Sequence, residues 1–330
     1  MRAIHLVQPG GPEALIEVDV PTPVPGAGEI RVKAEVIGVG RPDVLVRKGI
    51  YKWMPPLPAI PGSEMVGLVD ELGAGASSHL LGRRVLVSAR ELTVRGGCYA
   101  EFICVPEAAV FVLPDTIDPV DAASLPNLQL VNALWTCNGG REIQSILIPG
   151  VAGGVGSTLA QFARMKGVQV LGSTSTPEKE QFALRNGVDV LVKGDSTSWP
   201  AQVMQATGGV GVDLAVDQLG GDTLIACLRS LAPMGQVVSI NVVTGMPSED
   251  VFKEMRALLA RSPALRAFSM HTLDQEVTIR RGLMQAAIDQ MASGQVKAPT
   301  AQELALSQIQ QAHAWLDAGA SRGKLVIRMN

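Results

Sequence analysis

Aromatic side chains are scarce in this chain of 330 residues: they make up 4% of it, and only two of them are tyrosines. The four cysteines and the four histidines are scattered, and they show neither metal-ligand spacing nor the framework of a disulfide-rich fold. These absences argue against a metal centre built from Cys and His and against a secreted, disulfide-stabilised protein. We therefore expect a reducing, cytoplasmic location.

Charge of one sign and long apolar runs are also missing. The formal net charge is −3, so the sequence offers no basic stripe for nucleic acid or for an anionic membrane. No apolar run approaches the roughly 20 residues needed to cross a bilayer, and the first residues lack a secretory hydrophobic segment. We expect neither a nucleic-acid partner nor a membrane-bound protein.

Apolar residues are nevertheless plentiful, at 47% of the chain against 18% charged, and the length suggests two domains. Residues 1–122 are rich in short strands; residues 30–37, for example, alternate between apolar and polar side chains. The pattern then changes to alternating helices and strands over residues 123–271. The tail from 323 to 328 is typical of a strand, and we expect residues 272–330 to return to the first domain.

A glycine-rich turn lies at the centre of the second domain. The apolar run 146–148 is followed by glycines 150, 153, 154 and 156, then by apolar residues at helical spacing, then by the apolar run 168–171. Strand, glycine turn, helix and strand form the βαβ unit in which a dinucleotide pyrophosphate binds at the amino end of the helix. The alternative is a tight turn without a ligand. A second strand with a glycine turn, at residues 213–223, favours the parallel, doubly wound α/β sheet.

The residues after the second strand bear on the choice of nucleotide. An NAD-binding unit usually carries Asp or Glu there, whereas this chain has Ser173, Thr174 and Ser175, followed by Lys179. Hydroxyls and a lysine suit the 2′-phosphate of NADPH, which a carboxylate would repel. The alternative is a solvated turn in which Thr176 caps the next helix, and the two interpretations are compatible.

Several motifs together resemble the medium-chain dehydrogenase/reductase family, in its zinc-independent branch of quinone oxidoreductases and enoyl reductases. They span most of the chain: Ala152-Gly153-Gly154-Val155-Gly156, and the segments 37–51, 61–67, 212–221, 231–238 and 323–326. The resemblance implies a Rossmann domain inserted in a GroES-like β-barrel catalytic domain. At the positions where zinc-dependent relatives carry a Cys and a His ligand, this chain has Gly40 and Ser63, so no catalytic zinc is expected.

Chemistry without a Lewis acid favours acceptors that delocalise negative charge themselves. The resemblance therefore implies NADPH-dependent hydride transfer to quinones or conjugated carbonyls, with Tyr51 as the proton donor. Arg41 and Trp53 are expected to contact the substrate. A packed Tyr51 whose hydroxyl meets water and a solvated surface Arg41 are the alternatives. Tyr99 and Asp43 are expected to be structural.

The resemblance also implies further cofactor contacts at Leu219 and Asn241. The tyrosine that some relatives place on the 2′-phosphate corresponds to about position 194, where Lys193 is a possible substitute. Lys324 lies close to the position of an arginine found near the end of relatives. Val151 is larger than the usual residue that opens the glycine motif, and we expect it to crowd the phosphate slightly.

Two other functions remain open at this point. One is an enoyl thioester reductase acting on 2-enoyl-CoA or acyl-carrier-protein substrates. The other is a non-catalytic relative that binds NADPH as a structural or nucleic-acid-binding protein. The resemblance further implies a homodimer formed through the last strand of the nucleotide domain, around residues 265–270, whose apolar character fits a paired edge.

Overall fold

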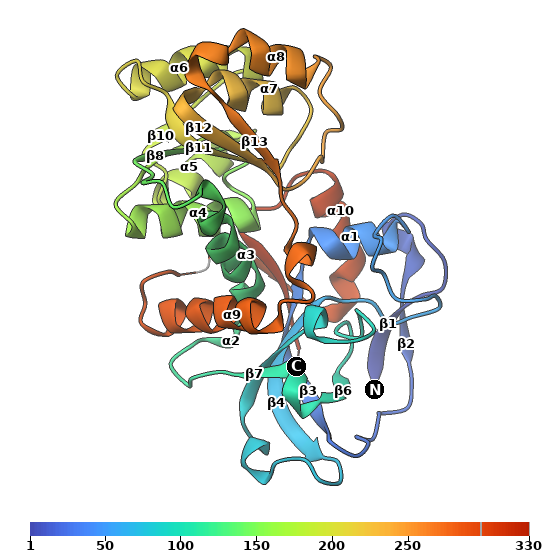
Figure 1. Ribbon diagram of the computed structural model, residues 1–330. Helices are drawn as coiled ribbons and strands as arrows, with labels where there is room; N and C mark the ends of the chain where they lie inside the picture. The colour runs from blue at the N-terminus through green and yellow to red at the C-terminus, as the bar shows by residue number, and fades with distance from the viewer. Residues whose placement is uncertain (298, 330) are drawn as a thin grey trace. The chain divides into compact units, whose positions relative to one another are not determined.

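The chain divides into two units, and the second interrupts the first. The computed structural model describes residues 1–297 and 299–329. One unit comprises Met1–Pro126 and Ala298–Asn330, and the other comprises Asn127–Lys297 (Figure 1). The second unit is thus inserted between two segments of the first, which is the organisation expected from the sequence.

A six-stranded sheet forms the centre of the second unit. Its strands are β8 (Ser145–Ile148), β9 (Gln169–Gly172), β10 (Val190–Leu191), β11 (Val212–Asp217), β12 (Leu231–Ser239) and β13 (Ala264–Ala267). The strand order is β10-β9-β8-β11-β12-β13, and every pair is parallel. The chain therefore starts in the middle, moves to one edge, and returns to build the other half, which defines a doubly wound Rossmann sheet.

Helices cover both faces of this sheet (Figure 1). The helices of this unit are α3 (Leu125–Trp135), α4 (Gly154–Met165), α5 (Pro177–Arg185), α6 (Trp199–Ala206), α7 (Asp222–Arg229), α8 (Val251–Ala257) and α9 (Val277–Ala292), of which α9 packs on α3 instead of on the sheet. Apolar side chains at helical spacing explain how they pack: Leu159, Phe162 and Ala163 on α4 are all buried. A core on the other side joins Trp199 and Val203 of α6 to α7 and to the sheet.

The first unit is built on a seven-stranded sheet. Its strands are β3 (Glu29–Val39), β4 (Glu64–Leu72), β5 (Arg84–Ser88), β6 (Phe102–Pro106), β7 (Val110–Val112), β14 (Thr300–Leu304) and β15 (Lys324–Arg328). The order is β14-β15-β3-β4-β5-β7, and β6 also pairs with β3. β15 joins the sheet antiparallel to β3, with Leu325 opposite Val39, so the end of the chain returns to this unit as expected.

Shorter elements complete the first unit. They are the hairpin β1 (Arg2–Leu6) and β2 (Leu15–Asp19), with helices α1 (Arg41–Arg47), α2 (Pro119–Ala122) and α10 (Ile309–Asp317). Residues 51–63, which include four prolines, contain neither a helix nor a named strand. At the crossing of β3 and β4, a Cβ on Gly67 would lie 2.1 Å from the Lys33 carbonyl oxygen, so only glycine fits there.

The boundary between the units differs from the expected one. We expected residues 272–330 to belong to the first domain, but the chain up to residue 297 lies in the second unit. The reason is that α9 packs on α3: the Gln129 amide donates to the Arg280 carbonyl at 2.9 Å, and Asn132 and Gln290 exchange hydrogen bonds at 3.1 Å. Such contacts across 150 residues leave no local signal in the sequence.

One predicted strand is shorter in the structure. The strand expected around residues 265–270 ends at Ala267, and a 3-10 turn begins at Met270. In the first unit, β6 begins only at Phe102, because the Cys98 and Tyr99 amides donate to the Gly62 and Pro61 carbonyls instead of to a strand.

Candidate functional site

The crevice in which a doubly wound sheet binds ligands lies where the strand order reverses, here at the carboxyl ends of β8 and β11. Gly150 follows β8, and Leu219 follows β11. The two turns are in contact: a Cβ on Gly150 would lie 3.2 Å from the Leu219 side chain, and Gly150 has a φ of +66°. The structure thus brings together two elements that the sequence had singled out separately.

The turn after β11 is fixed by Asp217, a residue that the sequence analysis did not assign. Its buried carboxylate accepts from the amides of Leu219 (3.0 Å) and Gly220 (3.1 Å) and from the Thr223 hydroxyl (3.0 Å). The neighbouring Gln218 amide donates to the Pro149 and Gly150 carbonyls at 3.0 and 3.1 Å. Both residues lie within the 212–221 motif, which was the available signal.

The amino end of α4 carries no side-chain cap. Gly153 is the N-cap, and it offers no acceptor to the first-turn amides of Gly154, Val155 and Gly156. The hydroxyl of Ser157 donates back to the Gly153 carbonyl at 2.8 Å, so it does not cap the helix either. An uncapped helix end with a glycine backbone presents N–H groups and a partial positive charge, which together suit an anion.

Close packing explains the glycine at position 156. A Cβ there would lie 2.8 Å from the Val151 Cα and 2.9 Å from the Gly150 carbonyl oxygen, so helix α4 could not start this near the turn with a larger residue. Ala152, between these positions, is also buried. The turn is therefore held against the helix by backbone contact.

The side chain of Val151, which we expected to crowd the phosphate slightly, lies in the interior. Val151 is fully buried, and its side chain faces Gly172 at the end of β9, where a Cβ would lie 2.5 Å from Val151 Cγ1. The larger residue is therefore accommodated by a glycine in the next strand, on the interior side of the turn.

The hydroxyl-rich segment after β9 contains one unpaired polar atom. Ser173 is buried, and its hydroxyl accepts from the Gly150 amide at 3.4 Å. The Thr174 Oγ1 is buried and has no hydrogen-bond partner among the described residues. Because a buried hydroxyl normally finds a partner, this atom is consistent with a ligand at this position.

Thr176 caps α5, as one interpretation of the sequence predicted. Its hydroxyl accepts from the Lys179 amide, and the Lys179 ammonium donates to the Ser175 hydroxyl at 3.4 Å. Lys179 in the first turn of α5 and Ser175, just before the N-cap, therefore lie side by side. The segment therefore caps a helix, and it also places the Lys179 ammonium beside a hydroxyl, so the two interpretations of the sequence are compatible.

Lys193 and Asn241, which we also expected to contact the cofactor, already have partners within the chain. The Lys193 ammonium forms an ion pair with Glu180 at 2.8 Å, so its charge is already balanced. Asn241 follows β12, and its side-chain oxygen accepts from the Val242 amide at 2.9 Å. In the part of the chain that the structure describes, the side-chain hydrogen bonds of Lys193 and Asn241 go to Glu180 and Val242, not to the glycine turn.

The first unit contains a buried polar network, made of Asp43, Ser63, Tyr99 and His313. The Asp43 carboxylate accepts from the Gly40 amide at 2.8 Å and from the Ser63 hydroxyl at 2.6 Å, and it also accepts from the Tyr99 hydroxyl. Burial raises the pKa of Asp43, and these donors oppose the shift. The carboxylate thereby ties the start of α1 to the segment before β4.

His313 extends this network from α10. Its Nε2 lies 3.0 Å from the Tyr99 hydroxyl, and because that hydroxyl donates to Asp43, the imidazole nitrogen is the donor to Tyr99. Burial lowers the pKa of His313 to about 3, and the nearby Arg47 acts in the same direction. Tyr99 is structural, as expected; the involvement of His313 was not foreseen, since the histidines form no cluster in the sequence.

Lys324 lies in the same interior instead of on a cofactor-binding surface. It is 4% exposed and forms an ion pair with Glu64. Its ammonium is 3.7 Å from the place of a Cβ on Gly40. Burial lowers the pKa of this ammonium, and Asp43 opposes the shift.

A zinc ion does not fit these residues. Gly40 has no side chain, the Ser63 hydroxyl is a weak ligand and already donates to Asp43, and a lysine ammonium lies beside them. Over residues 1–297 and 299–329, no group of three or more His, Cys, Asp or Glu side chains could hold a metal ion.

Tyr51 and Trp53 lie together on the loop that follows α1. Their ring centroids are 5.7 Å apart, and Trp53 is 38% exposed. The Arg95 guanidinium donates a hydrogen bond to the Tyr51 hydroxyl. Burial raises the pKa of Tyr51, whereas Arg90 and Arg95 oppose the shift, so the phenol keeps its proton at neutral pH.

Arg41 is half-buried and is not the solvated surface arginine of one interpretation. Its guanidinium donates to the Leu316 carbonyl at 3.3 Å, and its Nε is buried without a partner among the described residues. Arg41 does not line the pocket that contains Trp53. The structure therefore brings Tyr51 and Trp53 together but leaves Arg41 apart from them.

Comparisons with known proteins agree with this architecture. Residues 154–289 match the family model of zinc-binding dehydrogenases, and residues 26–115 match the alcohol dehydrogenase GroES-like domain. The quinone oxidoreductase of Rattus norvegicus is 30% identical over 332 residues, which cover 99% of this chain and 97% of the relative.

Solved structures give the same result. A mycobacterial protein in complex with NADPH is 30% identical with a TM-score of 0.87, and all of both chains is covered. Escherichia coli quinone oxidoreductase, also complexed with NADPH, is 25% identical with a TM-score of 0.84, again over all of both chains. Together these matches confirm the expected combination of a GroES-like domain and a Rossmann domain.

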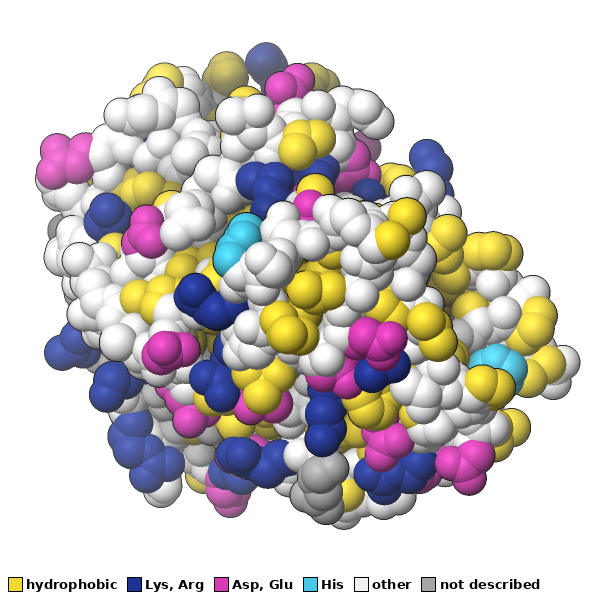
Figure 2. Space-filling model, turned by 90° about the horizontal axis from the view of Figure 1, so that it is seen from below, with side chains coloured by type: hydrophobic (Ala, Val, Ile, Leu, Met, Phe, Trp, Pro, Cys, Tyr) yellow, Lys and Arg dark blue, Asp and Glu magenta, His cyan; other side chains and the backbone are white. Residues whose placement is uncertain are grey.

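The surface carries charges of both signs. On the face shown in Figure 2, Lys and Arg side chains are interspersed with Asp and Glu, and hydrophobic side chains lie between them. Within residues 1–297 and 299–329, no helix is long and apolar enough to cross a membrane.

The buried histidine predicts a specific loss of stability in acid. His313 has a pKa of about 3 in the folded protein against 6.5 for the exposed group, so the unfolded chain binds a proton first as the pH falls below 6.5. Between pH 7 and pH 5 this group alone should lower the free energy of unfolding by about 2 kcal/mol. His313→Gln should remove that part of the pH dependence in urea denaturation.

The exposed His79 provides the control for this measurement. His79→Gln should follow the wild-type pH dependence. Parallel stability curves for the wild type and His313→Gln would show that His313 does not titrate as a buried neutral group.

Proposed function

The chain belongs to the quinone oxidoreductase branch of the medium-chain dehydrogenase/reductase family, and from that premise we propose that it reduces quinones or related conjugated carbonyls with NADPH, without a catalytic metal. The observation that carries this proposal is the uncapped amino end of α4, packed against Gly150 and the Leu219 turn where the strand order reverses. The NADPH complexes of the two similar structures support it.

The pyrophosphate of NADPH fits the glycine turn. The first-turn amides of Gly154, Val155 and Gly156 have no side-chain acceptor. Gly153 has no side chain to block a phosphate, and the nearest atom to a Cβ built there would be the Gly150 carbonyl oxygen, 3.4 Å away. Ala152 and Leu219 would form the walls of this cradle. Leu219 is held in place by the Asp217 carboxylate beneath its turn.

The 2′-phosphate fits the segment after β9. Thr174 offers the hydroxyl that has no partner, and Ser175 and Lys179 lie together at the start of α5. The phosphate would accept hydrogen bonds from the hydroxyls and from the lysine ammonium. We assign a smaller role to Lys193, whose charge Glu180 balances, and a structural role to the buried Lys324.

The chemistry of the acceptor follows from the first unit. When bound, the reduced nicotinamide supplies a hydride, and the acceptor then needs a proton on its oxygen. Tyr51 keeps its proton at neutral pH, and because Arg95 donates to its oxygen, the phenolic O–H is directed toward another acceptor. A quinone or enone spreads the negative charge over its own conjugated system, so Tyr51 can complete the reaction without a metal.

Replacing Lys179 should change the choice of cofactor. Lys179→Met removes the cation proposed to meet the 2′-phosphate, so the dissociation constant of NADPH should rise about tenfold, while that of NADH stays the same. Isothermal titration of both cofactors measures the effect. Lys253→Met, at an exposed lysine on α8, is the control and should bind both as the wild type does. An equal effect on NADPH and NADH would contradict this assignment.

Replacing Tyr51 should slow turnover without weakening cofactor binding. Tyr51→Phe should lower kcat with 1,2-naphthoquinone about 100-fold in the presence of excess chelator, since it removes the proposed proton donor. Ser78→Ala removes an exposed hydroxyl of the same unit, outside the pocket that contains Trp53, and should leave kcat unchanged. Wild-type turnover in Tyr51→Phe would exclude it as the donor, and loss of wild-type turnover in chelator would contradict metal-free chemistry.

We also propose that the protein is a homodimer. β13 lies at the edge of the six-stranded sheet, and in the described part of the chain it pairs only with β12. An unpaired edge of this kind is a surface to which a second copy can add a strand. Light scattering should give twice the mass of one chain, and the mass of a single chain would reject the proposal.

A further inference from the structure

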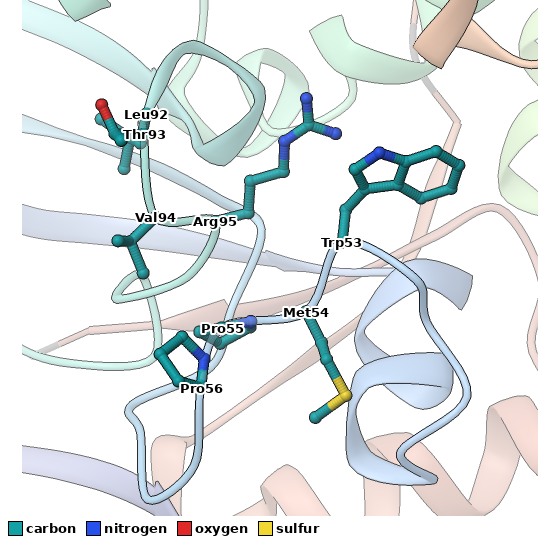
Figure 3. A pocket seen from close by; sticks show the side chains of 8 residues that line it. All are labelled: Trp53, Met54, Pro55, Pro56, Leu92, Thr93, Val94 and Arg95. Atoms are coloured by element: carbon teal, nitrogen blue, oxygen red, sulfur yellow. The ribbon is translucent and has the colours of Figure 1, made fainter.

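A pocket of about 320 Å³ lies between two loops of the first unit. One loop follows α1, and the other precedes β6. The side chains that line the pocket are those of Trp53, Met54, Pro55, Pro56, Leu92, Thr93, Val94 and Arg95 (Figure 3). This volume is at the lower end of the range for small-molecule sites, and it suits a ligand of one or two rings.

The lining is apolar apart from one threonine and one cation. Trp53 contributes an aromatic ring to the lining, and Met54 and the two prolines contribute apolar side chains. In Figure 3 the Arg95 guanidinium and the Trp53 indole extend in the same direction from their loops. An aromatic ring that packs on Trp53 would therefore lie within reach of a guanidinium.

The charges around the pocket are mainly positive. Arg90 and Arg95 both act on the Tyr51 hydroxyl, and the Lys52 ammonium lies 5.4 Å from the centre of the Trp53 ring. On the acidic side, Glu91 belongs to the segment 89–97, and the Asp43 carboxylate also acts on the Tyr51 hydroxyl. The two arginines and the lysine outnumber these two carboxylates, so the net charge near the pocket favours an anion.

We propose that Arg95 selects acceptors that carry an anionic substituent, a carboxylate or a sulfonate, on the ring that is reduced. This inference rests on the proposed reductase function and names the class of substrate for it. The ring packs on Trp53, and the anion accepts hydrogen bonds from the Arg95 guanidinium, which presents a planar fork of donors to such groups.

Arg95 also links binding to the proton donor. A guanidinium can donate to two acceptors at once, so its hydrogen bond to the Tyr51 hydroxyl is compatible with a second bond to the substrate. The substituent that anchors the ring and the phenol that meets its carbonyl oxygen would then be held by one side chain. An acceptor without the anion loses that alignment, and this makes Arg95 a specificity-determining residue.

The test compares two acceptors of the same ring system, 1,2-naphthoquinone-4-sulfonate and 1,2-naphthoquinone. The ratio of their kcat/KM values is measured for the wild type, Arg95→Gln, Arg95→Lys and the control Arg83→Gln, at an exposed arginine of the same unit. Loss of the hydrogen bond to Tyr51 slows both acceptors and cancels from the ratio. The difference in intrinsic reactivity between the two quinones is the same for every protein, so it cancels when the ratio of a variant is divided by that of the wild type.

Arg95→Gln should lower the ratio about tenfold, which corresponds to one charge-assisted hydrogen bond. Arg95→Lys should give an intermediate ratio, because it keeps the charge but loses the fork. Arg83→Gln should match the wild type. An unchanged ratio in Arg95→Gln would overturn the proposal.

A binding measurement separates this inference from the reductase function. Titration calorimetry with 2-naphthalenesulfonate, which cannot be reduced, should show binding to the wild type and about tenfold weaker binding to a folded Arg95→Gln. If neither quinone is reduced but this difference is present, the reductase proposal fails and the anion site stands. If both quinones are reduced and 2-naphthalenesulfonate binds both proteins equally, the anion site fails alone.

Discussion

The contact between Gly150 and the Leu219 turn is the constraint on which the nucleotide site depends. It brings the carboxyl ends of β8 and β11 together where the strand order reverses, and it leaves the amino end of α4 facing a backbone without side chains. Asp217 fixes one side of this contact through two backbone amides and a hydroxyl. The proposed phosphate site, which is built from backbone, therefore depends on a buried carboxylate that fixes the neighbouring turn.

In the first unit, a second buried carboxylate also holds two segments of the chain together. Asp43 joins the backbone at Gly40 to Ser63, the two positions at which zinc-dependent relatives carry metal ligands, while Tyr99 donates to the same carboxylate. The Lys324 ammonium lies beside Gly40. Hydrogen bonds and a lysine thus hold segments that a metal ion would otherwise bridge, and this arrangement is consistent with acceptors that need no Lewis acid.

The sequence predicted those parts of the fold that leave a local pattern. The alternation in β3, the glycine turn before α4 and the strand at 324–328 could be recognised because side-chain periodicity and glycine spacing are short-range properties. The sequence could not predict the packing of α9 on α3, since the hydrogen bond from Gln129 to Arg280 joins residues 151 positions apart. Residues 272–297 therefore belong to a different unit from the one expected.

Some residues of the candidate site could likewise be recognised from a local sequence pattern, whereas others are defined by long-range contacts. Hydroxyls at Ser173 and Thr174 could be predicted as the place of a 2′-phosphate, because they replace an acidic residue in a known pattern. The buried pairing of Lys324 with Glu64 could not, since nothing near either residue marks its partner. Arg95 was also missed, because its importance comes from contact with Tyr51 across two loops.

Binding of NADPH to the Gly153→Asp variant tests whether the pyrophosphate lies at the amino end of α4. Binding is measured by titration calorimetry, and thermal unfolding is measured beside it. Gly153 has a φ of −74°, and a Cβ there would meet only the Gly150 carbonyl oxygen, at an ordinary contact distance of 3.4 Å, so aspartate fits there and should cap α4, leaving the melting temperature unchanged or higher. The same carboxylate would occupy the proposed pyrophosphate site. We predict that the wild type binds one NADPH per chain and that the folded variant binds none. Undiminished binding by the variant, or no binding by the wild type, would contradict the account.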